Sequence, residues 1–197
     1  MSDSIKNAYN TAGPTYRERY DSIPPRSKDV DLTLGYITNP NPKVVEIGCA
    51  YGREAQYILT KTTDYTGIDI SHVYVDMANR EVAGGQFICA DVLDFAFPKN
   101  VDAVFAFASL LHSSKEDVAV VLGRVAASLA DGGVVFLSLK RRDVYETVVE
   151  TDDLVSRRFY YYTKQTILDL LPASLTEVFY DEQERTESWF TMILQKQ

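Results

Sequence analysis

Short apolar runs alternate with segments of helical periodicity between residues 43 and 139, and this alternation limits the possible folds more than any other feature. The apolar runs predict strands at residues 43–47, 65–70, 86–89, 101–107 and 134–139. The segments between them predict helices at about 53–60, 72–82 and 116–130. Strands that alternate with helices form βαβ units, whose right-handed crossovers give a parallel sheet covered on both faces.

The segment before the first strand is predicted to be helical. Three tyrosines are spaced seven and then four residues apart, which places them on one helical face: Tyr9, Tyr16 and Tyr20. Gly13 and Pro14 interrupt this spacing and predict two short helical pieces around a turn. The pair Pro24-Pro25 separates these pieces from a second helix at about 27–38.

After residue 140 the alternation becomes irregular. A polar stretch at 141–156 leads to Phe159-Tyr160-Tyr161-Tyr162, whose rings either line a pocket or pack in an edge-strand core; we expect core packing for at least two. A helix at about 164–171 and strands at about 175–180 and 187–195 follow. We therefore expect a single α/β domain over 1–197, doubly wound, with a mostly parallel seven-stranded sheet. Its parts are N-terminal helices (1–40), a ligand-binding core (41–140) and C-terminal edge and substrate-side elements (141–197).

Composition argues against several classes of function. The net charge of −8 and the absence of a long basic stretch disfavour binding to DNA or RNA. No apolar run is long enough to cross a bilayer, and the first ten residues do not resemble a signal peptide, so we expect a cytoplasmic protein without a membrane partner. Two cysteines and two histidines provide no spaced set of metal ligands, and both thiols are expected to be free.

The most informative segment is the turn after the first strand, where Gly48 and Gly52 lead into a helix. Glycine permits a sharp turn and the close approach of a ligand to the backbone. Asp69 stands 21 residues after Gly48 at the end of the second strand, and Asp91 follows the third strand 22 residues later. Because these strand ends share one edge of the sheet, they predict an adenosine-type ligand there, with Asp69 accepting hydrogen bonds from ribose hydroxyls.

Residues 42–140 resemble the class I S-adenosylmethionine-dependent methyltransferases. The family pattern acid-x-Gly-x-Gly-x-Gly is matched by Glu46, Gly48, Ala50 and Gly52, with Ala50 in place of the middle glycine. The family's Pro-Gly-Gly turn before the fifth strand resembles Asp131-Gly132-Gly133. A nicotinamide-binding Rossmann domain is the competing interpretation, but its Gly-x-Gly-x-x-Gly pattern is not met after Gly48.

The resemblance implies a Rossmann-like methyltransferase fold, S-adenosylmethionine as cofactor, and a set of cofactor-binding residues. Glu46 and Gly48 would face the methionine part, Asp69 the ribose, Asp91 and Val92 the adenine, and Ala108 the region near the sulfonium. Cys49, Ala50, Gly52 and Ile70 complete the predicted contacts. It also implies that the N-terminal helices form a lid, with Tyr16 and Arg17 covering the donor; the alternative is that the tyrosines only dock the helix.

Methyl transfer depends mainly on positioning, so the sequence need not contain a catalytic base. His112, after the fourth strand, is the best candidate for one, and Tyr16 is a second; the alternative for His112 is an ordinary hydrogen-bonded loop histidine. We expect transfer to a small-molecule acceptor, with no nucleic acid as partner. The alternative is a catalytically silent S-adenosylmethionine-binding or partner subunit of the same fold.

Overall fold

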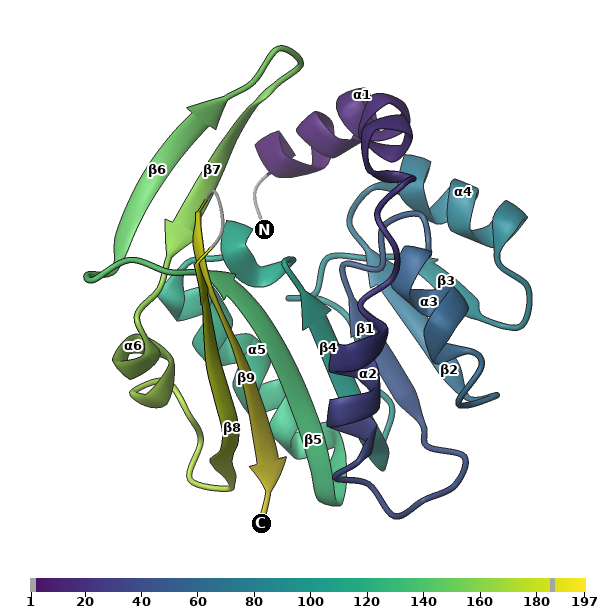
Figure 1. Ribbon diagram of the computed structural model, residues 1–197, viewed down its shortest axis with the longest axis vertical. Coiled ribbons are helices and arrows are strands. Elements are labelled where there is room, and N and C mark those ends of the chain that lie inside the picture. The colour runs from purple at the N-terminus through teal and green to yellow at the C-terminus, as the bar shows by residue number, and fades with distance from the viewer. Residues whose placement is uncertain (1–2, 185–186) are drawn as a thin grey trace.

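The computed structural model describes residues 3–184 and 187–197, which form a seven-stranded sheet and a separate two-stranded hairpin (Figure 1). The sheet contains β1 (Val44–Ile47), β2 (Tyr65–Asp69), β3 (Gln86–Cys89), β4 (Val101–Phe107), β5 (Leu129–Lys140), β8 (Leu175–Glu184) and β9 (Ser188–Lys196). The hairpin consists of β6 (Glu146–Thr151) and β7 (Ser156–Tyr161). The helices are α1 (Asp3–Tyr20), α2 (Ser27–Leu34), α3 (Arg53–Ile58), α4 (His72–Glu81), α5 (Lys115–Ser128) and α6 (Lys164–Leu168), with a 3₁₀ turn, η1 (Leu110–His112).

The order of strands in the large sheet is β3-β2-β1-β4-β5-β9-β8. Neighbours from β3 to β5 are parallel, whereas β9 is antiparallel to both β5 and β8. This topology confirms the predicted doubly wound, mostly parallel seven-stranded α/β fold. The strand order reverses between β1 and β4, and ligands in open α/β sheets bind beyond the carboxyl ends of the strands at such a point.

Helices cover both faces of the sheet because its central strands are apolar on both sides. All four residues of β1 are buried. One face packs against α2, α3 and α4 through Val30, Ala55, Ile58, Val75 and Ala78. The other face packs against α5 through Val118, Val121, Leu122 and Val125. In the described part of the chain, no helix is long and apolar enough to cross a membrane.

The N-terminal segment differs from its prediction. A single helix, α1, continues through Pro14 where two pieces around a turn were expected. A proline removes one amide donor from a helix, and the buried face of α1 compensates by packing onto the domain through Ile5, Ala8, Ala12 and Tyr16. Gly13 permits a close approach to α4, since a Cβ there would lie 3.3 Å from Cε1 of Tyr74. Residues 1–2 of the predicted N-terminal segment lie outside the described residues.

Two predicted boundaries are also wrong. Helix α2 ends at Leu34 rather than near residue 38, because the chain turns through backbone hydrogen bonds from Tyr36 to Thr33 and from Ile37 to Leu34. Strand β5 begins at Leu129, so the segment 131–133 lies within the strand and does not simply end the preceding helix. The positive φ of Gly132 (77°) accommodates the irregularity between β4 and β5.

The β6–β7 hairpin has no counterpart in the sequence prediction, which left 141–156 without regular structure. Residues of β6 alternate between half-buried and exposed, and their polar character hides the strand pattern. The aromatic cluster that follows confirms the expected core packing, since Phe159, Tyr161 and Tyr162 are buried in the cluster that includes α5. The Tyr162 hydroxyl donates to the Ser113 carbonyl at 2.6 Å, which joins the base of the hairpin to the segment after β4.

Helix α1 and the hairpin lie above the carboxyl ends of the parallel strands, at the top of Figure 1. The Tyr16 hydroxyl donates to the Asp152 carboxylate at the tip of the hairpin. Arg19 pairs with Asp153 at the same tip, with Nη1 3.0 Å from Oδ1. Two side-chain links therefore join α1 to the hairpin across the strand ends.

Replacement of Tyr16 by Phe should speed amide hydrogen exchange across residues 3–20. The lost bond to a charged carboxylate is worth roughly 1.5–3 kcal/mol, so local opening of α1 becomes at least about tenfold more frequent. The matched control is Tyr57→Phe, which removes a phenol that bonds Asp31 on α2 and does not touch α1.

In the parent protein, exchange mass spectrometry should find that S-adenosylhomocysteine slows amide exchange in α1. Identical exchange with and without this ligand would make α1 a fixed helix instead of a lid.

Candidate functional site

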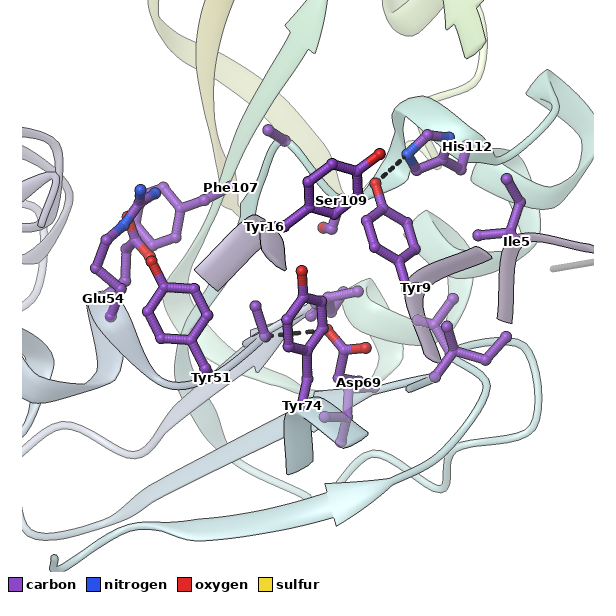
Figure 2. A pocket seen from close by; sticks show the side chains of 18 of the residues that line it. Ile5, Tyr9, Tyr16, Tyr51, Glu54, Asp69, Tyr74, Phe107, Ser109 and His112 are labelled. Carbon is purple, nitrogen blue, oxygen red and sulfur yellow. Dashed lines mark hydrogen bonds and ion pairs between the residues drawn. The ribbon is translucent and has the colours of Figure 1, made fainter. Parts of the chain in front are cut away.

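A cavity opens at the carboxyl ends of β1, β2 and β4, beneath α1 (Figure 2). Eight residues predicted for the site line it: Tyr16, Gly48, Ala50, Asp69, Ile70, Val92, Ala108 and His112. It is also lined by Ile5, Tyr9, Tyr20, Ile47, Tyr51, Arg53, Glu54, Ile68, Tyr74, Ala90, Phe107, Ser109 and Arg157. The lining combines tyrosine and phenylalanine rings with polar groups at Asp69, at the Arg53–Glu54 pair, and at His112 and Arg157.

The turn after β1 passes under the cavity in a conformation that favours glycine. Gly48 has φ +74°, and a Cβ at this position would lie 2.3 Å from Cβ of Ser109. Ala50 has φ 47°, so this alanine adopts the left-handed conformation that the family pattern assigns to glycine. The turn keeps its shape despite the methyl group because the Ala50 amide donates to Asp69 Oδ2 at 2.9 Å.

Asp69 ends β2 and faces the cavity from below in Figure 2. Its two carboxylate oxygens each accept one backbone amide, Oδ2 from Ala50 and Oδ1 from Ser71 at 2.8 Å. A carboxylate oxygen accepts more than one hydrogen bond, so both oxygens can still accept from a ligand diol. Burial raises the pKa of Asp69 to about 6, although backbone hydrogen bonds from Ser71, Ala50 and Ile70 oppose this shift.

Two further polar groups at the cavity fit a ligand with several hydrogen-bonding atoms. Among the residues that the structure describes, Ser109 Oγ and the Tyr51 hydroxyl are buried and have no hydrogen-bond partner. Buried polar atoms are normally paired, and a bound molecule can supply the partner. With the Gly48 turn and Asp69, these groups fit an adenosine and amino-acid ligand such as S-adenosylmethionine.

Five predicted cofactor contacts lie outside the cavity lining. Gly52 is the N-cap residue before α3, with φ 88°; Cys49 is buried in the core, and Asp91 accepts the Leu93 amide at 2.9 Å. Arg17 turns toward α4 and pairs with Glu81 at 2.7 Å rather than toward the cavity. Gly52, Cys49 and Asp91 therefore belong to the turns around the cavity, and Arg17 joins α1 to α4.

Glu46 is the fifth of them and is 1% exposed. It accepts a hydrogen bond from the Tyr65 hydroxyl inside the fold. Burial, and next the Glu54 carboxylate, raise the pKa of Glu46 to about 8, which favours its neutral form at neutral pH. The side chain therefore braces β1 against β2.

At the other end of the cavity, His112 is held by hydrogen bonds on both ring nitrogens. Nδ1 lies 2.6 Å from the Arg158 carbonyl, which can only accept, so Nδ1 carries the hydrogen. Nε2 is then the acceptor for the Tyr9 hydroxyl at 2.6 Å, as Figure 2 shows. Burial lowers the pKa of His112 to about 4, and the charges of Arg157 and Lys140 act in the same direction.

The second predicted catalytic residue, Tyr16, lines the same end of the cavity, but its hydroxyl does not bond His112 as the Tyr9 hydroxyl does. Its hydroxyl bonds Asp152, and Arg157 bonds the same carboxylate at 2.8 Å. The Arg157 guanidinium lies over the rings of Tyr16, at 4.8 Å, and Tyr9, at 5.7 Å. Helix α1 and strand β7 together form an aromatic wall around one arginine.

Sequence reasoning missed several cavity residues for different reasons. Tyr9 was placed correctly on the face shared with Tyr16 and Tyr20, but its pairing with His112 spans 103 residues and leaves no local signal. Arg157 belongs to the hairpin that was not predicted. Ser109, next to Ala108, and Tyr51, within the glycine turn, could have been found from their place at strand ends.

Comparison with known proteins identifies the class of domain to which the central segment of the chain is similar. Residues 44–133 match the family model of the methyltransferase domain. These residues therefore form a methyltransferase domain by sequence, in agreement with the class I resemblance seen above. S-adenosylmethionine is the cofactor of that family, and the cavity residues described above fit it.

The curated relatives are distant. A trans-aconitate 2-methyltransferase from Acidovorax ebreus (strain TPSY) is 28% identical over 129 residues, which are 64% of this chain and 48% of that protein. The protein of the same name from Acidovorax sp. (strain JS42) is 30% identical over a stretch that covers the same shares. The chain thus matches about half the length of these relatives.

Solved structures share the fold at low identity. An S-adenosylmethionine-dependent methyltransferase from Clostridium acetobutylicum ATCC 824 has a TM-score of 0.77 at 11% identity, over 93% of this chain and 98% of that one. Magnesium protoporphyrin IX methyltransferase from Synechocystis PCC 6803, with bound S-adenosylmethionine, has a TM-score of 0.76 at 15% identity, over 100% of this chain and 98% of that one.

Replacement of Asp69 by Ala should weaken binding of S-adenosylhomocysteine by roughly 1.5–3 kcal/mol, or about 10- to 150-fold in Kd. The parent's affinity should also fall as pH drops below about 6, because the protonated carboxyl accepts less strongly. Calorimetry between pH 5 and pH 8 measures both effects. Asp64→Ala, just before the same strand and exposed, is the control; unchanged affinity in a folded Asp69→Ala protein would remove Asp69 from the site.

His112 should titrate with a midpoint near pH 4 in the folded protein. The ordinary value is 6.5, so the folded state binds this proton less readily than the unfolded chain does. The stability that results is complete above about pH 6.5 and is lost as pH falls toward 4. Nitrogen-15 NMR of the two histidines measures the midpoint and the tautomer; a midpoint near 6.5, or a hydrogen on Nε2, would contradict the pairing with Tyr9.

Proposed function

We propose that the protein transfers a methyl group from S-adenosylmethionine to a small-molecule acceptor. The observation that carries this proposal is one cavity with two chemically different ends, at Asp69 and at His112. The first end suits the ribose of the cofactor, while the second is walled by aromatic rings and by Arg157. Enclosed aromatic pockets favour compact, partly apolar ligands over polymer surfaces.

Residues of the chain bind, orient and exclude water in this proposal. Asp69, Ala50 and Gly48 would hold the adenosine and the amino-acid backbone of the cofactor, which supplies an electrophilic methyl group. Tyr9, Tyr16 and Arg157 would hold the acceptor under α1. Alignment of donor and acceptor supplies most of the acceleration in such a displacement, and closure by α1 and the hairpin would keep that alignment.

The relatives support a small acceptor by analogy. The curated matches are named for trans-aconitate, and one solved structure of the same fold is a 1,6-didemethyltoxoflavin-N1-methyltransferase from Burkholderia thailandensis with that small molecule bound. The net charge of −8 further disfavours phosphate polymers as acceptors. A cytoplasmic location remains part of this proposal.

Incubation of the protein with methyl-labelled S-adenosylmethionine and size-separated fractions of a cell extract should place label in the low-molecular-weight fraction. Label confined to RNA or protein would overturn the choice of a small acceptor. Binding of S-adenosylhomocysteine without transfer to any fraction would favour the alternative of a catalytically silent cofactor-binding subunit. The Asp69→Ala protein is the control, because label that still appears with this variant does not depend on the cofactor site.

A further inference from the structure

We propose that Tyr9 is the general base of the reaction, that His112 receives the proton through it, and that the acceptor presents a weakly acidic hydroxyl group. This inference rests on the proposed methyl transfer and narrows its substrate class. It assigns catalysis to Tyr9 rather than to Tyr16, which lies on the same helix, α1.

The geometry supports a two-residue relay. Tyr9 lines the cavity, and its hydroxyl donates to His112 Nε2 at 2.6 Å. His112 is fixed in place because its Nδ1 donates to the Arg158 carbonyl at 2.6 Å and its ring packs on Phe159 with centroids 4.6 Å apart. A tyrosine that donates its proton to a neutral imidazole can accept a second proton on its oxygen, which here also hydrogen-bonds Arg157.

The relay itself, rather than the charges around it, selects the kind of acceptor. Arg157 acts on both Tyr9 and His112, and Lys140 acts on His112, while Asp69, Glu150 and Tyr20 oppose them. Arg157 is paired with Asp152, and Lys140 is paired with Glu150 and Glu187, so carboxylates balance both cations. A carboxylate acceptor carries no proton to remove, so its methylation would not need the relay. A phenolic or enolic hydroxyl needs the relay and suits the aromatic wall.

The acceptor oxygen releases its proton to Tyr9 Oη while the tyrosine proton moves to His112 Nε2. The acceptor oxygen forms the bond to the methyl carbon as the bond from that carbon to sulfur breaks, and its electron pair stays on sulfur. Because burial lowers the pKa of His112 to about 4, His112 holds the extra proton only briefly and passes it to water, and the pair returns to its starting state.

The test compares Tyr9→Phe, His112→Gln and the double variant in the labelled transfer assay, with Tyr57→Phe as the control for loss of a phenol elsewhere. Each single variant should lower kcat by roughly 100-fold, the usual contribution of a general base, and leave the KM for S-adenosylmethionine within about twofold. The double variant should lose no more than either single one, because the two residues act as a unit. Binding of S-adenosylhomocysteine, measured by calorimetry, should match the parent and shows that the variants are folded.

The labelled product gives a second, independent test. A methyl ether resists mild alkali, whereas a methyl ester releases its label as methanol and a methylated amine is retained by a cation exchanger. Alkali-stable, non-cationic product with the kcat losses above supports the relay. An ester or amine product would overturn the relay. So would additive losses of kcat in the double variant, or a loss of affinity for S-adenosylhomocysteine with kcat intact. A parent protein that transfers no label at all would instead remove the proposed function, and the relay with it.

Discussion

The carboxylate of Asp69 is the constraint on which the arrangement of the cofactor end depends. By accepting the amides of Ala50 and Ser71, it ties the turn after β1 to the end of β2 and to the start of α4. Asp69 is buried, so both bonds form in a region of low dielectric where an unpaired carboxylate would be costly. The same side chain that would bind the ligand therefore also shapes the turn beneath it.

A second consequence of this tie concerns Ala50. An alanine in the left-handed region costs about 1–2 kcal/mol relative to glycine, and such strain persists only where neighbouring contacts fix the backbone. The hydrogen bond to Asp69 and the burial of Cys49 beside it provide that constraint. This explains how the chain departs from the family's glycine pattern and still forms the turn.

The sequence was sufficient to predict the central fold because apolar strands and amphipathic helices carry periodic signals. It also located Gly48, Asp69, Val92 and His112 at the cavity, since strand ends of a parallel sheet meet at one edge. It could not predict the β6–β7 hairpin, because polar and apolar residues do not alternate along Glu146–Thr151 or Ser156–Tyr161. The partnership of Tyr9 with His112 was equally hidden, because helix periodicity gives the face of a residue but not what lies opposite. Pro14 misled the prediction because tertiary packing of α1 outweighs a local helix-breaking signal.

Apart from His112, the residues at the two ends of the cavity come from different parts of the chain. Gly48, Asp69 and Val92 lie within the segment that matches the family model, whereas Tyr9, Tyr16 and Arg157 lie before and after it. The fold thereby separates the elements that would hold the acceptor from those that would hold the cofactor. Exchange of α1 and the hairpin would give a descendant a new acceptor without disturbing the β-sheet, the glycine turn or Asp69. Sequence divergence between descendants would then accumulate in α1 and the hairpin, while the strand-end turns stayed unchanged.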